Sequence, residues 1–177
     1  MKKYLQGSWN VIKNYLFGML FFYIFYIGFY GKSTLFSIAI YIIMVLLIYN
    51  EMAHYVGKDK RKFGKNTLFD GAIYGLIAIV PFALIQIIIY FLSFDFTWIK
   101  FDVFKMTMIK GFMAPMLFII KGLGNSIWAY MVGWASLIVF SFLGYFAGYK
   151  GFDLSMHLRK LVGLAPKKPQ PKKGIRR

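Results

Sequence analysis

The stretch Gly57-Lys58-Asp59-Lys60-Arg61-Lys62-Phe63-Gly64-Lys65 lies between two long apolar runs and carries five basic residues against one acid. Short loops of this composition remain on the cytoplasmic side when a protein crosses a membrane. We therefore predict that residues 57–65 form a cytoplasmic loop. The side of the membrane on which every other segment lies then follows from this loop.

The composition of the whole chain favours lipid as its solvent. Of its 177 residues 59% are hydrophobic and 16% are charged, whereas a soluble domain is about half apolar and about a quarter charged. The net charge of +16 could indicate nucleic-acid binding, but the basic residues gather in loops and tails that flank apolar runs. The absence of cysteine excludes disulfides, thiolate catalysis and cysteine metal sites.

Four uncharged runs are long enough for membrane spans, since about 20 helical residues cross a hydrocarbon core of about 30 Å. They cover residues 14–31, 34–50, 71–94 and 126–149. The tight Gly31-Lys32-Ser33 link predicts an antiparallel hairpin of the first two spans, with Trp9 and Tyr15 near the cytoplasmic interface. The expected fold is an all-α integral membrane protein, a four-span transmembrane helix bundle within a single domain at residues 1–164.

Residues 95–125 do not fit a simple span. Charges alternate with aromatic residues up to Lys110, which is typical of a helix lying in the membrane interface. The apolar run Phe112–Ile120 is too short to cross and contains Pro115. We predict an outer interfacial or re-entrant segment. The alternative is a fifth span from Gly111 to about Met131, which would put the C-terminal tail on the opposite side.

The distribution of basic residues favours four spans. An amphipathic stretch at Leu154–Leu161 precedes a tail at residues 165–177, whose prolines and like charges predict disorder. With four spans, both termini and all but five of the 22 lysines and arginines are cytoplasmic. The five exceptions are Lys32, Lys100, Lys105, Lys110 and Lys121.

Two glycine motifs predict close helix packing. Small residues four apart allow helix backbones to approach each other in lipid. The motifs are Gly71-x-x-x-Gly75 and Gly144-x-x-x-Gly148, and we expect them to pack the third span against the fourth. Thr67 and Asp70 have the spacing of a capping box at the start of the third span.

Few residues point to chemistry. Glu51 and His54 form a lone Glu-x-x-His pair, short of the two pairs that a di-iron bundle requires. No phosphate-binding loop, dinucleotide fingerprint, nucleophile elbow or zincin motif occurs. Lys121, between Pro115 and a pair of glycines, is the candidate for an unusual buried charge, although a lysine there can also extend to the interface. We predict no catalytic residue, metal or cofactor.

These observations predict a non-enzymatic accessory or scaffold protein of a bacterial-type plasma membrane. Its expected partners are anionic phospholipids and another membrane protein, with no specific nucleic acid, although a basic tail could also touch ribosomal RNA. The residues expected to bind lipid headgroups are Lys58, Lys60, Arg61, Lys62, Lys65, Lys167, Lys168, Lys172, Lys173, Arg176 and Arg177. The alternative function is a transporter or channel subunit in which residues 112–125 line the path, and a membrane enzyme comes third.

Overall fold

The computed structural model describes residues 2–28, 33–64, 66–91 and 101–152, and all the secondary structure in these ranges is helical. Four helices are long and apolar enough to cross a membrane. They are α1 (Lys2–Gly28), α2 (Ser33–Phe63), α3 (Asp70–Phe91) and α6 (Ile127–Tyr149). The shorter α4 (Phe101–Phe112), the 3-10 turn η1 (Ala114–Met116) and α5 (Leu117–Gly122) lie between α3 and α6 along the chain.

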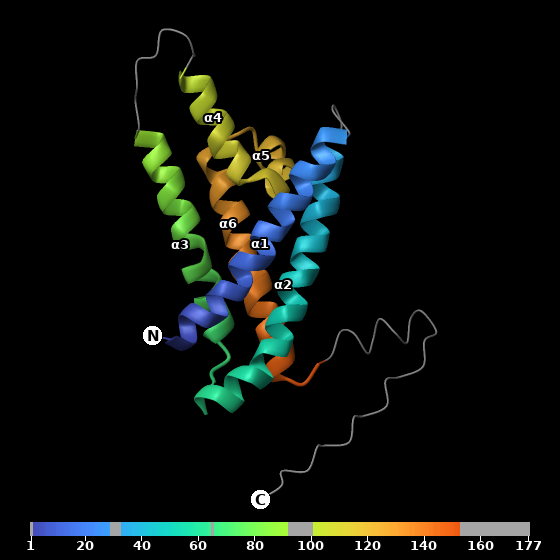
Figure 1. Ribbon diagram of the computed structural model, residues 1–177, viewed down its shortest axis with the longest axis vertical. Helices are drawn as coiled ribbons and strands as arrows, with labels where there is room; N and C mark the ends of the chain where they lie inside the picture. Colours follow the sequence, from blue (N-terminus) through green and yellow to red (C-terminus); the bar gives the residue numbers. More distant parts are fainter. Residues whose placement is uncertain (1, 29–32, 65, 92–100, 153–177) are drawn as a thin grey trace, which may run out of the picture.

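The four long helices run up and down along the long axis of the molecule (Figure 1). The beginning of α1 and the end of α6 lie at one end, together with the turn from α2 to α3. We call this the aspartate end, because Asp59 and Asp70 are buried there. The opposite end contains α4, η1 and α5, and we call it the hairpin end.

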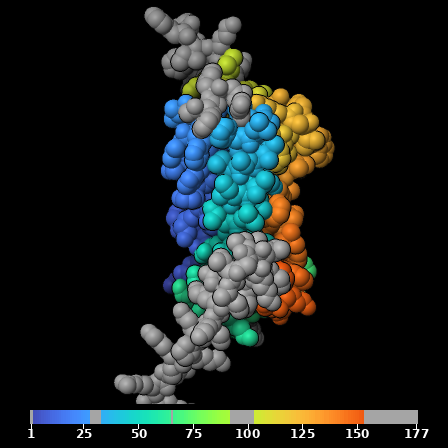
Figure 2. Space-filling model, turned by 90° about the vertical axis from the view of Figure 1, so that its right-hand side faces the viewer, coloured from blue at the N-terminus to red at the C-terminus, as the bar shows by residue number. Residues whose placement is uncertain are grey.

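Helix α2 lies at the centre of one side of the bundle. It packs against α1 and α6, and Figure 2 shows it between α1 and the α5–α6 region. Its core-facing residues recur at helical spacing, from Ile40 through Met44 and Ile48 to Met52. Met44, Ile48 and Met52 join a buried cluster that includes Tyr74 of α3 and Trp134 of α6, while Ile40 packs with Phe22 and Ala114.

The prediction of a loop at residues 57–65 was wrong for residues 57–63, which continue α2. No proline interrupts the stretch. Lys60, Arg61 and Lys62 occupy the last turn, where their positive charge interacts favourably with the negative end of the helix dipole. The helix ends at Gly64, whose φ of +74° suits a glycine after the last turn. Its amide bonds the carbonyl of Lys60 at 3.1 Å.

A continuous helix from Gly111 to about Met131, which we had considered as a fifth span, is also absent. The described helices form five spans only if Val103–Phe112 and Ala114–Gly122 are counted together as one bent span. The helix is interrupted between α4 and η1, and the helical segments on the two sides of this interruption meet at a bend of 84°. A second turn separates α5 from α6, with φ of 70° at Gly124 and 56° at Asn125. The predicted amphipathic stretch at Leu154–Leu161 and the tail at residues 165–177 lie outside the described residues.

Tyr15, which we had predicted near the cytoplasmic interface, is buried inside the bundle. It is 1% exposed and its ring contacts Phe82 of α3 and Trp134 of α6. Trp128, at the start of α6, remains 68% exposed. An aromatic residue near the end of an apolar run can therefore be a core residue of the bundle rather than an interface anchor.

Candidate functional site

Asp59 is the buried acid at the centre of the aspartate end. Because α2 remains helical, Asp59 follows Met52, Tyr55 and Val56 on the face that packs into the bundle. The basic residues around it, Lys58, Lys60, Arg61 and Lys62, are exposed. The same nine-residue stretch thus buries its one acid and presents its bases to the surroundings.

Two buried tyrosines bind the Asp59 carboxylate. The hydroxyl of Tyr74, on α3, donates to Asp59 Oδ2 at 2.7 Å, and the hydroxyl of Tyr145, on α6, donates to the same oxygen at 2.6 Å. Both tyrosines are 0% exposed, and their rings meet edge to face with centroids 5.6 Å apart. Asp59 therefore joins α2 to two other helices through charge-assisted hydrogen bonds, which are the stronger kind.

Lys3 adds the fourth helix to this cluster. Its Nζ lies 2.5 Å from Asp70 Oδ2 and 3.6 Å from Asp59 Oδ2. Its side chain is 15% exposed, while those of Asp59 and Asp70 are 0% and 2% exposed. A mostly buried ammonium on α1 thus lies between two buried carboxylates on α2 and α3.

Asp70 also begins α3. Its Oδ2 accepts the backbone N–H of Thr67 at 2.7 Å, and its Oδ1 accepts the Thr67 hydroxyl at 3.0 Å. The first bond is the half of the predicted capping box in which the acid returns to the backbone. In a capping box, the threonine hydroxyl would also accept the amide N–H of Asp70. Here the Thr67 hydroxyl donates to the Asp70 carboxylate instead.

The cluster contains more negative than positive formal charge, since two carboxylates share one ammonium. Among the described residues, none donates a hydrogen bond to Asp59 Oδ1, which is buried. Buried charges are costly unless they are paired, and removing one partner of such a pair is strongly destabilising. We therefore interpret Lys3, Asp59, Asp70, Tyr74 and Tyr145 as a clamp that holds the four long helices at this end.

Sequence reasoning missed Lys3, Asp59, Tyr74 and Tyr145 as members of one cluster. The available signal was the spacing of Asp59 from Met52 and Val56, which places an acid on an apolar helical face if the helix continues. The basic residues around Asp59 concealed that signal, because they are typical of a loop.

The four glycines of the two motifs lie at close helix contacts, but with two different partners. A Cβ on Gly75 would lie 2.8 Å from the Cα of Ile138, and one on Gly71 would lie 2.9 Å from the Ser141 carbonyl, both on α6. A Cβ on Gly144 would lie 2.5 Å from the Tyr49 carbonyl of α2. A Cβ on Gly148 would lie closer still to the Ala53 carbonyl of α2. The α6 motif therefore packs on α2, and not on α3 as we had expected.

At the hairpin end, hydroxyl groups satisfy the backbone of the broken helix. Tyr15 donates to the Phe112 carbonyl and Tyr23 to the Gly111 carbonyl at 2.9 Å. Ser37 donates to the Pro115 carbonyl at 3.0 Å and accepts the Phe118 amide at 3.1 Å. Buried backbone carbonyls outside a regular helix require such partners, and here α1 and α2 supply them.

Gln86 and Lys121 are polar residues of this end. Gln86 of α3 donates to the Ile109 carbonyl at 3.3 Å and accepts the Trp134 indole N–H at 3.0 Å. It therefore links α3 to α4 and α6. Lys121 is exposed and donates to the hydroxyls of Ser33 at 2.9 Å and Thr34 at 3.3 Å. Of the two alternatives for this residue, the buried charge is therefore excluded.

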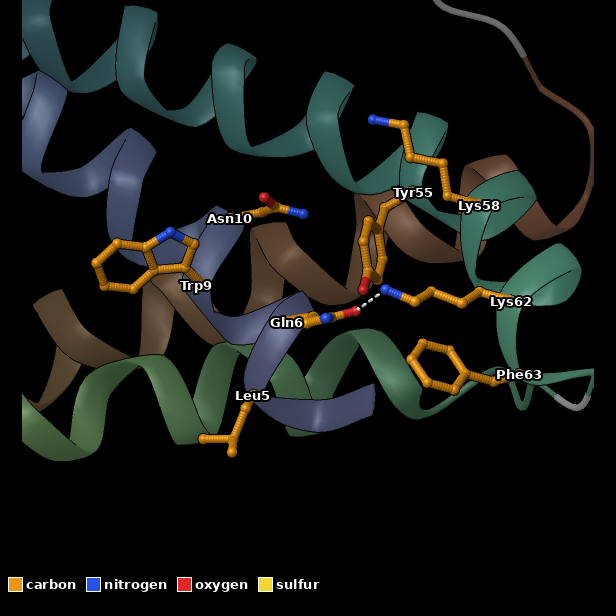
Figure 3. A pocket seen from close by; sticks show the side chains of 8 residues that line it. All are labelled: Leu5, Gln6, Trp9, Asn10, Tyr55, Lys58, Lys62 and Phe63. Atoms are coloured by element: carbon orange, nitrogen blue, oxygen red, sulfur yellow. Dashed lines mark hydrogen bonds between the residues drawn. The ribbon is translucent and has the colours of Figure 1, made fainter. Parts of the chain in front are cut away.

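The four described residues that were predicted to bind headgroups lie on two exposed faces of α2. Lys58 and Lys62 line a groove of about 570 Å³ between α2 and the first turns of α1 (Figure 3). Lys60 and Arg61 are exposed outside that lining. Lys65 and the tail residues Lys167, Lys168, Lys172, Lys173, Arg176 and Arg177 lie outside the described residues.

Glu51 and His54 do not form a metal site in the part of the chain that the structure describes, where no group of three or more potential ligands occurs. Glu51 instead lies 3.8 Å from Lys58 in a partly exposed ion pair. No family model matches the chain, and no curated protein and no solved structure matches it at a significant level.

Proposed function

We propose that the chain is an integral membrane protein of a bacterial-type plasma membrane, with four spans and the aspartate end on the cytoplasmic side. In this role it is a non-enzymatic accessory or scaffold protein that binds anionic phospholipids and another membrane protein. The lengths of the four apolar helices support the membrane placement. The exposed bases at the aspartate end support its orientation, because such residues favour the cytoplasm.

The scaffold proposal rests on the groups that the buried polar side chains bind. Asp59, Asp70, Ser37 and Ser141 are buried, and all four bond a neighbouring helix or a helix start. The outer faces of the long helices expose large apolar residues along their lengths, among them Leu20, Ile42, Ile88 and Val139. Polar groups thus fix the helices to one another, while the exterior offers apolar surface to lipid or a partner helix.

Reconstitution of the purified chain tests this proposal. Alone in liposomes, a scaffold should leave sodium, potassium and proton gradients intact. After cross-linking in native membranes, it should purify in mild detergent with a second membrane protein at a constant ratio. Dissipation of a gradient by the chain alone would contradict the accessory role, and so would purification of the cross-linked chain without any partner.

The broken helix favours a second candidate, a transporter or channel subunit. Discontinuous helices within a bundle are typical of transport sites, where free backbone carbonyls meet the substrate. The break between α4 and η1 is buried at Met113–Met116. However, hydroxyls of α1 and α2 already bond the carbonyls of Gly111, Phe112 and Pro115. If the chain is a transporter or channel subunit, liposomes that contain it should lose an ion gradient. Ser37→Ala, which frees the Pro115 carbonyl, should alter the rate of that loss.

A further inference from the structure

The groove between α1 and α2 combines positive charge with amide and aromatic groups. Helix α1 contributes Leu5, Gln6, Trp9 and Asn10, and α2 contributes Tyr55, Lys58, Lys62 and Phe63. Gln6 and Lys62 approach each other across it, with Lys62 Nζ 2.8 Å from Gln6 Oε1 (Figure 3). Two ammonium groups and two side-chain amides therefore surround a hollow whose described lining contains no carboxylate.

A second hollow continues the same seam toward the middle of the helices. It has a volume of about 280 Å³ and is lined by Lys13, Asn14, Phe17, Leu47 and Glu51. Asn10 and Asn14 are four residues apart on α1, as Tyr55 and Glu51 are on α2, so each pair shares a helix face. The two hollows therefore follow each other along one seam. Charged and polar side chains border both hollows, and Phe17 and Leu47 add apolar surface in the second.

The length of this seam fits a lipid. At 1.5 Å per residue, Leu47 lies about 22 Å along α2 from Lys62, comparable to one leaflet with its headgroup layer. Trp9 is 57% exposed and borders the groove, a position that tryptophan prefers at the level of headgroups. Phe17, 49% exposed, lies where acyl chains would run.

We propose that this seam binds one anionic phospholipid of the cytoplasmic leaflet. Its phosphate and headgroup occupy the groove between Lys58 and Lys62, where ammonium and amide N–H groups donate to phosphate oxygens. Its acyl chains lie across Phe17 and Leu47. Glu51 lies 3.8 Å from Lys58 and shares the lining of the second hollow with Lys13, so positive charge next to this carboxylate offsets part of its repulsion of the phosphate. The proposal rests on the membrane placement given above and specifies its lipid partner.

The test uses the full chain, purified in neutral detergent and stripped of lipid. Binding of phosphatidylglycerol, phosphatidylcholine, a short-chain phosphatidylglycerol and inorganic phosphate is counted by native mass spectrometry over a concentration series. We expect one phosphatidylglycerol to bind in preference to phosphatidylcholine, with the short-chain lipid weaker and phosphate weakest. Tighter binding of phosphate than of the lipid would assign the groove to a free anion and overturn the proposal.

A matched pair of variants separates this groove from general attraction. Lys58→Gln with Lys62→Gln should weaken phosphatidylglycerol binding by about tenfold or more. Lys60→Gln with Arg61→Gln removes the same charge from the same helix end, and should change binding by less than about threefold. Equal losses in the two pairs would show diffuse attraction and contradict a defined site.

The proposed lipid site and the proposed membrane orientation can be disproved independently of each other. The binding experiment is done in detergent and does not depend on which side of the membrane the groove faces. An inverted orientation in cells would overturn the proposed topology, with the preference for anionic lipid still measurable. Absence of that preference in a correctly oriented protein would overturn the lipid site alone.

Discussion

The two ends of the bundle solve the problem of buried polar groups in different ways. At the aspartate end, side chains of four helices meet in one ionic cluster around Asp59 and Lys3. At the hairpin end, hydroxyls of α1 and α2 bond backbone carbonyls that the break between α4 and η1 leaves free. The first end is held by charged groups that compensate one another in a single cluster. The second end is held by separate hydrogen bonds between hydroxyl groups and backbone carbonyls.

This difference predicts how each end responds to substitution. Removal of one member of a buried ionic cluster leaves uncompensated charge, whereas removal of one hydroxyl leaves one carbonyl without its donor. The aspartate end should therefore be cooperative and sensitive, and the hairpin end more tolerant.

The largest effect is expected for Lys3→Met. Two buried carboxylates would remain without their ammonium, which should lower the free energy of unfolding by about 3–5 kcal/mol. The midpoint of thermal unfolding in detergent measures this loss. Lys2→Met, at an exposed position one residue away, should match the parent.

A combined variant sharpens the interpretation of Lys3. Adding Asp70→Asn to Lys3→Met removes one of the two unpaired carboxylates and should recover part of the lost stability. If Lys3→Met unfolds like the parent, or if the second substitution adds a further independent loss, the ionic cluster does not hold the four helices.

The next effect concerns the contact of α6 with α2, which extends from the core to the aspartate end. Gly144→Ala and Gly148→Ala should each destabilise by about 1–3 kcal/mol, because a methyl group would displace the backbone of α2. Gly57→Ala is the matched control, since nothing lies within 4 Å of a Cβ there. It should be neutral or stabilising by up to about 1 kcal/mol. Equal effects at all three positions would show that helix propensity, and not packing, decides.

A smaller effect is expected at the hairpin end. Ser37→Ala removes the partner of the Pro115 carbonyl and of the Phe118 amide, and should cost about 1 kcal/mol. Hydrogen exchange at Phe118 should become faster, while exchange near Asp59 stays unchanged. Thr107→Ala, whose exposed hydroxyl bonds the Val103 carbonyl within its own helix, should leave Phe118 as it is. Faster exchange at both ends would contradict their independence.

Sequence reasoning predicted the helical class and the number of long apolar helices, because both follow from composition and run length. It could not predict that Gly144 and Gly148 pack on α2, since a small-residue motif marks a close-packing face but does not identify the neighbouring helix. It also assigned Asp59 to a loop, because the local charge pattern outweighed the periodicity that continues through it. The partners of Tyr15 and Ser37 are backbone carbonyls about 80 to 100 residues away along the chain, and residue types give no signal for such contacts.

The central claim is that the two ends lie on opposite sides of a membrane, with the aspartate end in the cytoplasm. The chain contains no cysteine, so single cysteines can be placed at two exposed positions, Lys60→Cys at the aspartate end and Leu123→Cys at the hairpin end. In intact cells, a membrane-impermeant thiol reagent should label residue 123 and reach residue 60 only after permeabilisation. Labelling of residue 60 in intact cells, or equal labelling of both, would contradict the account.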